Sequence, residues 1–333
     1  AWVPGFSGRD NVQSGSNLFA MPNMGGVYKF NRKMSIGFAG VAFGGGNTRY
    51  NENFFEFAGD PPPTLGANLA QAVMSPSVCY NLAKHHTLGA SVLLGIQQFR
   101  AYGMTAFGDA GFSSDPDNLS NNGNDYSVGA GFRVGWLSKF FKGRLSLGAT
   151  ASSRVRMTKL DKYKGLLAQN GRLDLPAIYG AGIAVKPVKK LTLTGDIQYI
   201  NYSDIKAISN RGPKQFLPLP PDNKLLGASQ GFGFGWQDMW VYKIGAKYEL
   251  NDKWIARAGY NYADTPISDI ELLSNTIAPA TVKHHATLGF TYNASKNSEW
   301  SFAGMWAFKE QQVGFDSFSN DNIRISMYQY ALE

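Results

Sequence analysis

The stretch WSFAGMWAF, Trp300–Phe308, alternates with a period of two. This period is typical of a β-strand, whose successive side chains point to opposite faces. One face carries the aromatic residues and a glycine, and the other carries serine, alanine and methionine. A soluble sheet normally buries its bulky face and exposes a polar one. Because the second face here is small rather than charged, we expect the aromatic face to meet lipid and the small face to line an interior.

The same alternation recurs along the chain and predicts thirteen strands separated by turn-like clusters. Short polar turns alternate with long connections all the way down. That order is typical of an outer-membrane barrel, whereas a large soluble β-sandwich, the alternative, has no reason to keep it. We therefore predict an all-β, transmembrane, antiparallel up-and-down β-barrel. The expected strands are 18–31, 33–44, 69–82, 86–102, 125–138, 143–158, 177–187, 189–202, 237–250, 253–264, 281–294, 298–309 and 322–333.

Composition narrows the class of protein further. The chain has 333 residues and a net charge of +8. No window reaches the roughly 18 apolar residues of a transmembrane helix. The basic residues are scattered, so we expect no nucleic-acid partner and find an anionic lipid surface or an acidic small molecule a better match. The single cysteine, Cys79, forms no internal disulfide and cannot build a structural zinc site.

Isolated cationic residues occupy predicted lumen faces, opposite apolar stripes. They could hold an entering carboxylate through charge-assisted hydrogen bonds, which arginine forms best. They could equally pair with Asp196 and Glu249 as ordinary interior salt bridges, and the sequence leaves both readings open. The residues are Arg133, Arg154, Arg156, Lys243, Lys247 and Arg257.

Two long connections, 103–124 and 159–176, carry apolar residues among polar ones. Exposed apolar patches on loops indicate binding, although the same side chains could simply pack the loops onto the barrel mouth. In the second connection we expect a short helix that ends near Gly171 and places Leu160 on the same face as two of the candidates. The candidate binding residues are Phe107, Phe112, Leu119, Tyr163, Leu166 and Leu167.

From residue 143 onward the chain resembles the long-chain fatty acid transporters of Gram-negative outer membranes, the FadL-type family, which includes aromatic-hydrocarbon channels. The family fold is a fourteen-stranded barrel with an N-terminal plug. Since thirteen strands are predicted, we expect residues 1–333 to be a single barrel domain without the plug and the first strand. The resemblance rests on LDKYKGLLAQNGRLDLPAIYGAGIAVKP (160–187), LTLTGDIQYINYSDIKAI (191–208), GFGWQDMWVYKIGAKYEL (233–250), RAGYNYADTPI (257–267) and HATLGFTY (285–292).

The resemblance implies passive uptake of long-chain fatty acids or hydrocarbons across the bacterial outer membrane. In the family, two loops form the entry groove and a kinked third strand releases substrate sideways into the membrane. The segment 34–47 corresponds to that strand, with Gly37 and Gly40 as the expected exit and Gly40 as the kink, although these glycines could also form a strand end and loop. We further expect a monomer that contacts outer-membrane lipid and lipopolysaccharide.

Two other functions remain open from the residues. A barrel of this kind could serve as a structural or docking platform in an envelope complex, or as an outer-membrane hydrolase. The histidines form two adjacent pairs, His85-His86 and His284-His285, and neighbours on a strand point to opposite faces. No nucleophile motif accompanies them, so we expect no catalytic residues, no metal and no cofactor.

Overall fold

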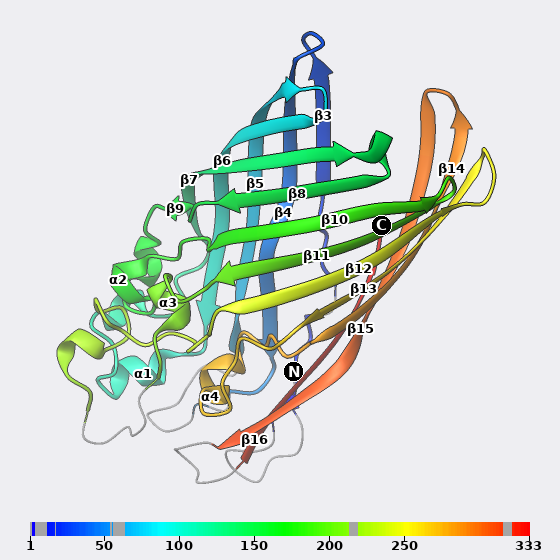
Figure 1. Cartoon of the computed structure of the whole chain (residues 1–333). Coiled ribbons are helices and arrows are strands. Elements are labelled where there is room, and N and C mark those ends of the chain that lie inside the picture. Colours follow the sequence, from blue (N-terminus) through cyan, green and yellow to red (C-terminus); the bar gives the residue numbers. More distant parts are fainter. Residues whose placement is uncertain are drawn as a thin grey trace.

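The computed structural model describes residues 2–3, 12–16, 18–53, 55, 64–212, 219–315 and 322–333. Within these residues one antiparallel sheet of fourteen strands dominates the fold (Figure 1). Its strands are β3 (Asn23–Lys29), β4 (Met34–Tyr50), β5 (Leu65–Ala83), β6 (His86–Tyr102), β7 (Asp125–Phe140), β8 (Leu145–Ser152), β9 (Arg156–Met157), β10 (Ala177–Val188), β11 (Leu191–Asn201), β12 (Met239–Glu249), β13 (Trp254–Ala263), β14 (His284–Ser295), β15 (Ser298–Phe315) and β16 (Asn322–Leu332).

The strands pair in the order of the chain, as expected of an up-and-down barrel wall. The wall is open between β3 and β16 in the described residues, where β3 pairs with β4 and β16 with β15. A separate two-stranded sheet joins β1 (Trp2–Val3) to β2 (Val12–Gln13). No helix in the described ranges is long and apolar enough to cross a bilayer.

The two ends of the sheet differ, as Figure 1 shows: tight turns join the strands at one end, and the long connections gather at the other. The long connections contain short helices, whereas η2 lies in a tight turn. The helices are α1 (Thr105–Asp109), α2 (Ala168–Gly171), α3 (Lys206–Ser209), α4 (Leu272–Asn275) and the 3-10 turns η1 (Pro116–Asn118), η2 (Phe141–Gly143), η3 (Asp161–Tyr163) and η4 (Asp222–Lys224). In outer-membrane barrels the long loops are extracellular, so we call that end the mouth.

The face assignment of the opening stretch is confirmed. Trp300, Phe302 and Trp306 are 62%, 51% and 50% exposed on the outside of the sheet, whereas Ala307 is fully buried. Because the outer surface of the barrel is apolar and the pleat alternates, the period of two in the sequence directly reports the two sides of the wall.

The thirteen predicted strands all form, and β6 has the predicted bounds. The segment 143–158 differs, because it is divided into β8 and β9. Arg133 of β7 pairs with Ser152, but Ala130 pairs with Arg156. Three residues, 153–155, therefore oppose two on β7, which is a β-bulge. A one-residue shift in register reverses which face each side chain occupies beyond it.

Candidate functional site

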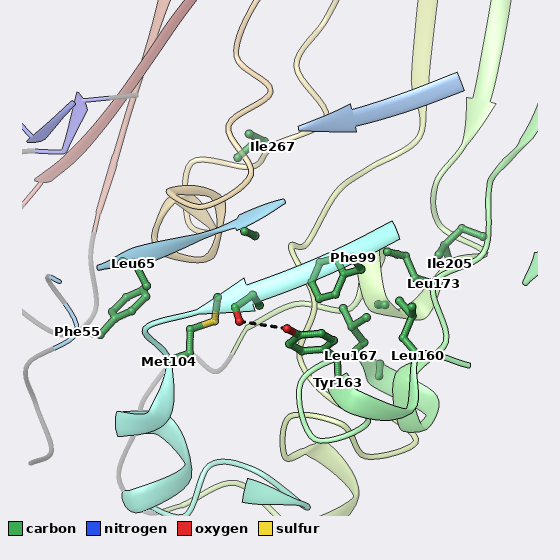
Figure 2. Packing of buried hydrophobic residues seen from close by; sticks show 14 of the residues in the cluster. Phe55, Leu65, Phe99, Met104, Leu160, Tyr163, Leu167, Leu173, Ile205 and Ile267 are labelled. Carbon is green, nitrogen blue, oxygen red and sulfur yellow. Dashed lines mark hydrogen bonds between the residues drawn. The ribbon is translucent and has the colours of Figure 1, made fainter. Parts of the chain in front are cut away.

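The mouth of the barrel is filled by a buried apolar cluster, which we call the mouth cluster (Figure 2). Its members come from strand ends and from most of the long connections, including α3, α4 and the end of β16. Side chains from distant segments thus form one hydrophobic core over the lumen. The fully enclosed members are Tyr50, Phe55, Leu65, Ala67, Phe99, Ala101, Met104, Leu160, Tyr163, Leu167, Ala168, Leu173, Ile205, Ala207, Ile267, Leu272, Ile323 and Ile325.

Tyr163 belongs to this cluster and is fully buried. Its ring packs edge-on against Phe99, with ring centroids 4.9 Å apart. Its hydroxyl donates to the carbonyl of Gly123 at 2.5 Å. The hydroxyl also lies 3.4 Å from the carbonyl of Ala101, the contact that a dashed line marks in Figure 2. Burial raises the pKa of the Tyr163 hydroxyl above its usual value. The side chain therefore joins the connection 159–176 to β6 and to the preceding loop.

The six predicted loop residues are brought close together, but they point inward. Tyr163, Leu166, Leu167 and Phe107 pack in the mouth cluster. Phe112 contacts the ring of Phe107 and is 4% exposed. Leu119, also buried, lies beside Gly108 in the same loop. These contacts match the alternative in which the side chains pack the loops onto the mouth; their role in binding remains a prediction.

The expected helix at 160–171 is in fact two short turns, η3 and α2. Gly171, where it was expected to end, has a φ of +89°, and an added Cβ would lie 2.4 Å from the carbonyl oxygen of Leu160. Only glycine is compatible with this close approach. Leu160, Tyr163 and Leu167 nevertheless pack in the same cluster, as the predicted helix face required.

A second apolar cluster, which we call the lumen cluster, lies deeper inside the barrel. It consists of Val73, Leu93, Val155, Met157 and Leu175, and Phe43 packs against it. The interior was expected to be the more polar side of the wall, and in this region that expectation is wrong. The bulge between β8 and β9 contributes to this, because it turns Val155 and Met157 inward.

Gln71 and Gln97 separate the two clusters, and we call this pair the glutamine rung. They are directly opposed on β5 and β6, and Gln71 Nε2 donates to Gln97 Oε1 at 2.9 Å. Gln97 is 1% exposed, and its Nε2 donates to the carbonyl of Leu173 at 2.9 Å. Sequence reasoning missed this pair. The signal was present, since Leu69 and Val73 flank Gln71 two positions away on the same strand face, and Phe99 is in the same position beside Gln97.

Four of the predicted cationic residues lie on the lumen face, and three of them bond to a neutral side chain. Nε of Arg133 donates to Ser152 Oγ at 2.8 Å, and Lys243 Nζ donates to Gln198 Oε1 at 3.0 Å. Arg257 donates to the hydroxyl of Thr291. By contrast, Lys247 forms an ion pair with Glu249 at 3.1 Å, as the salt-bridge alternative predicted.

Lys243 stands in a cross-strand row with Asn261 and His285. Two buried atoms of this row, Asn261 Oδ1 and His285 Nδ1, have no hydrogen-bond partner in the part of the chain that the structure describes. Buried polar atoms without partners are uncommon, and they are places where a ligand or a water molecule can bind. Asn261 was not among the predicted site residues, and it is polar in an otherwise aromatic strand segment.

The predicted lumen position of Arg156 is wrong, because the bulge turns its side chain outward. Arg156 pairs with Ala130, a residue on the outer face. Arg154 lies within the bulge; its Nη1 donates to the carbonyl of Asp204 at 2.9 Å, and its Nε lies 3.5 Å from Asp174 Oδ2. Both arginines border a pocket on the outside of the wall.

The predicted position of the kink in β4 is also wrong. Gly37 and Gly40 are paired in register with both neighbouring strands. The register of β4 against β5 shifts between Ala42 and Gly44, so the bulged residue is Phe43. Its side chain packs against the lumen cluster.

Polar contacts fasten the mouth loops to each other. Lys164 and Asp115 form an ion pair at 2.9 Å between the two loops predicted to bind substrate. Hydrogen bonds from Asn118 and Lys164 hold the pKa of Asp115 below its usual value. Glu271, beside α4, is 5% exposed and accepts a bond from the backbone N–H of Gly212. Burial raises the pKa of this carboxyl group.

A curved antiparallel wall with aromatic residues outside, tight turns at one end and apolar loops over the other defines an outer-membrane β-barrel. The family model described as "Outer membrane protein transport protein (OMPP1/FadL/TodX)" matches residues 6–328. The chain belongs to this family of outer-membrane transport proteins. The expected family, barrel fold and outer-membrane location are thus confirmed.

Solved structures show the same fold. The toluene transporter TodX of P. putida superposes with a TM-score of 0.68 and 18% identity, over 99% of this chain and 84% of TodX. A FadL homologue of Pseudomonas aeruginosa superposes with a TM-score of 0.64 and 16% identity, over 98% of this chain and 80% of the homologue. The monoaromatic hydrocarbon channel CymD superposes with a TM-score of 0.55 and 14% identity, over 94% of this chain and 81% of CymD. No curated protein matches the chain in sequence.

Proposed function

We propose that this barrel takes up hydrophobic compounds of the class of long-chain fatty acids or aromatic hydrocarbons. Similar folds described as a toluene transporter and a monoaromatic hydrocarbon channel support this class. Such molecules dissolve poorly in a watery pore, so their passage needs apolar side chains inside the wall. Substrate would enter by displacing contacts within the mouth cluster and would then reach the lumen cluster.

The observation that carries the proposal is that the two clusters lie on the same strands. Consecutive lumen-facing side chains, which we call a file, lead along each strand from the mouth cluster to the lumen cluster. On β6 the file runs Phe99, Gln97, Gly95, Leu93, and the side chain of Leu93 is 2% exposed. On β5 a matching file ends at Val73. The glutamine rung is the one polar step in these two files between the clusters. An apolar route broken by a single amide pair suits a compound that is mostly hydrocarbon.

A carboxylate head group would find cationic residues along the route. Lys243 is one candidate, because its ammonium group can donate to a carboxylate and the ring nitrogen Nδ1 of His285 in the same row has no partner among the described residues. Charge-assisted hydrogen bonds would hold a fatty acid there more strongly than a hydrocarbon. Lys243→Gln should therefore reduce uptake of oleate about tenfold, given the roughly 1.5–3 kcal/mol of such a bond, and leave toluene uptake unchanged.

For release we propose a sideways exit near the bulge at Phe43 in β4. Bulges locally disrupt the ladder and bend the strand, and Phe43 connects this one to the lumen cluster. Gly45 adopts a φ of +156°, and a Cβ there would lie 2.5 Å from the carbonyl oxygen of Leu69. Gly45→Val should thus distort the bulge and reduce flux, whereas Gly37→Val should have little effect.

The direct test compares neighbouring residues that face opposite sides of the same strand. Leu93 is 2% exposed in the lumen cluster, and Leu94 is 42% exposed on the outer face. Cells that lack other uptake routes would express the chain and be supplied with labelled oleate or toluene. Leu93→Asn should abolish most uptake, and Leu94→Asn should not. Equal uptake by both variants and the native chain, with both folded in the membrane, would reject the proposal in favour of a docking platform.

A further inference from the structure

A pocket of about 600 Å³ lies on the outer face of the wall, beside the bulge between β8 and β9. Its two aromatic lining residues, Phe132 and Tyr179, are 60% and 46% exposed on that face. Small residues between them leave the space open. The lining residues are Ala130, Gly131, Phe132, Ser153, Arg154, Arg156, Ala177, Tyr179 and Asp204.

The pocket is a notch in the wall and not a hole through it. Behind it, Val155 and Leu175 exchange two backbone hydrogen bonds of 3.1 Å each. The Val155 side chain points to the lumen cluster and is 2% exposed. Pro176 has no backbone N–H, so the ladder beside the bulge is interrupted there. The bulge thus replaces a flat stretch of outer surface by a recess.

The lining carries two guanidinium groups, Arg154 and Arg156, and one carboxylate, Asp204. Arg154 is held by Asp174, which is 3% exposed and lies behind it, and by the backbone of Asp204. The Asp204 carboxylate accepts a hydrogen bond from Asn201 at 2.9 Å. Arg156 is exposed on the outer face and has no ion pair within the described ranges. Of the two guanidinium groups, Arg156 is therefore the one whose donors remain available.

The level of the recess in the membrane follows from the aromatic residues beside it. Tyr179, Tyr199 and Trp240 are neighbours across three strands, with ring centroids 6.3 Å and 4.9 Å apart. Rows of tyrosine and tryptophan mark the membrane interface. The pairing across β8 places Tyr179 at the level of Val134 on β7. Arg156 lies at the level of Ala130 on the same strand, four residues nearer the mouth. An outward arginine costs about 2–4 kcal/mol at the midplane of a bilayer but about 0–1 near its surface.

We propose that this recess binds the phosphorylated head group of a lipid in the outer leaflet. Arg156 donates to the phosphate, and Phe132 and Tyr179 pack against the first part of the lipid chains. Arginine forms paired hydrogen bonds with phosphate, and an anionic group with an attached hydrocarbon matches a recess with cations toward the mouth and aromatic rings toward the membrane. This site faces lipid, so it is separate from the route of the transported compound.

The test uses the purified full chain in detergent and measures lipid retention by native mass spectrometry. The probes are bisphosphorylated lipid A, the same lipid without phosphates, inorganic phosphate and oleate. Arg156→Gln should weaken binding of bisphosphorylated lipid A about tenfold or more, the equivalent of one charge-assisted hydrogen bond. Arg156→Lys should bind this lipid more weakly than the native chain and more strongly than Arg156→Gln. Arg144→Gln, at the opposite end of β8, removes an exposed arginine elsewhere and should bind as the native chain does.

Each outcome decides the proposal. Weaker binding in Arg156→Gln together with poor retention of the dephosphorylated lipid supports it. Equal retention of the phosphorylated and dephosphorylated lipids would overturn it, as would unchanged binding in Arg156→Gln. Displacement by oleate at equal concentration would assign the site to a carboxylate instead. Displacement by millimolar inorganic phosphate would show that the phosphate binds without its lipid, which also overturns it.

Discussion

The two halves of the barrel interior are built differently. Near the mouth, β5 and β6 contribute Leu65, Val73, Leu93 and Phe99 to buried clusters. Toward the tight turns, the same strand faces carry Ser75, Ser77, Cys79 and Ser91, and the hydroxyls of Ser77 and Ser91 lie 2.8 Å apart. One strand can thus line a protein-like core at one end and a polar channel at the other. The half near the mouth is therefore packed with apolar side chains, while the half near the tight turns is lined by polar ones on these two strands.

The largest effect should come from removing a fully buried side chain of the mouth cluster. Tyr163→Ala creates a cavity and leaves the carbonyl of Gly123 without its bond, which should cost about 3–5 kcal/mol in the loop region. Limited proteolysis should then cut 103–124 and 159–176 faster in the folded barrel. Tyr179→Ala, on the outer face, is the matched control. Unchanged protection in Tyr163→Ala would mean that the mouth is not packed as a core.

The next largest effect is expected at the glutamine rung, which lies between the mouth cluster and the lumen cluster. Gln97→Leu leaves Gln71 and the carbonyl of Leu173 without a partner and should lower the free energy of unfolding by about 1–3 kcal/mol. The double variant Gln71→Leu, Gln97→Leu removes both amides and should recover the part of the loss that comes from Gln71, while the carbonyl of Leu173 still lacks its donor. Denaturant unfolding of all three proteins measures this. A double variant no more stable than Gln97→Leu would contradict the pairing.

A smaller effect is expected in the polar half. Ser77→Ala removes one hydroxyl of the pair with Ser91 and should cost only about 0.5–1.5 kcal/mol. Uptake of toluene should stay at the native level, because the route there does not depend on packing. A loss as large as that of Tyr163→Ala would show that the two halves are packed alike.

The smallest effect is a dependence on pH within the mouth. Burial raises the pKa of Glu271, so the stability it supports is complete below its ordinary value of 4.5 and falls as pH rises through the raised value. The pKa of Asp115 is lowered, so its contribution is present above its ordinary 3.8 and is lost as pH falls through the lowered value. Glu271→Gln should therefore flatten the decline of loop protection above pH 4.5. Hydrogen exchange of the loops between pH 4 and 8 gives the measurement.

The sequence predicts the strands because lipid on one side and the lumen on the other impose a period of two. It does not predict the two bulges, since one extra residue at Phe43 or at 153–155 has no signature in that period. This is why Arg156 was expected inside and why Gly40 was expected to be the kink. The loop residues were identified individually, but their common cluster depends on contacts between distant segments, such as Tyr50 with Thr276, which local patterns do not contain.

The bulge before β9 also decides which solvent Arg156 meets. Three residues, 153–155, take the place of two, so that beyond them Arg156 opposes Ala130 and Met157 opposes Gly129. Deleting one of the three would remove the bulge and leave the guanidinium outside and the thioether inside. Straightening the strand without a deletion would instead shift its register by one residue and place the Arg156 guanidinium inside the barrel. A single extra residue thus carries a charge from one side of the wall to the other without exchanging any side chain.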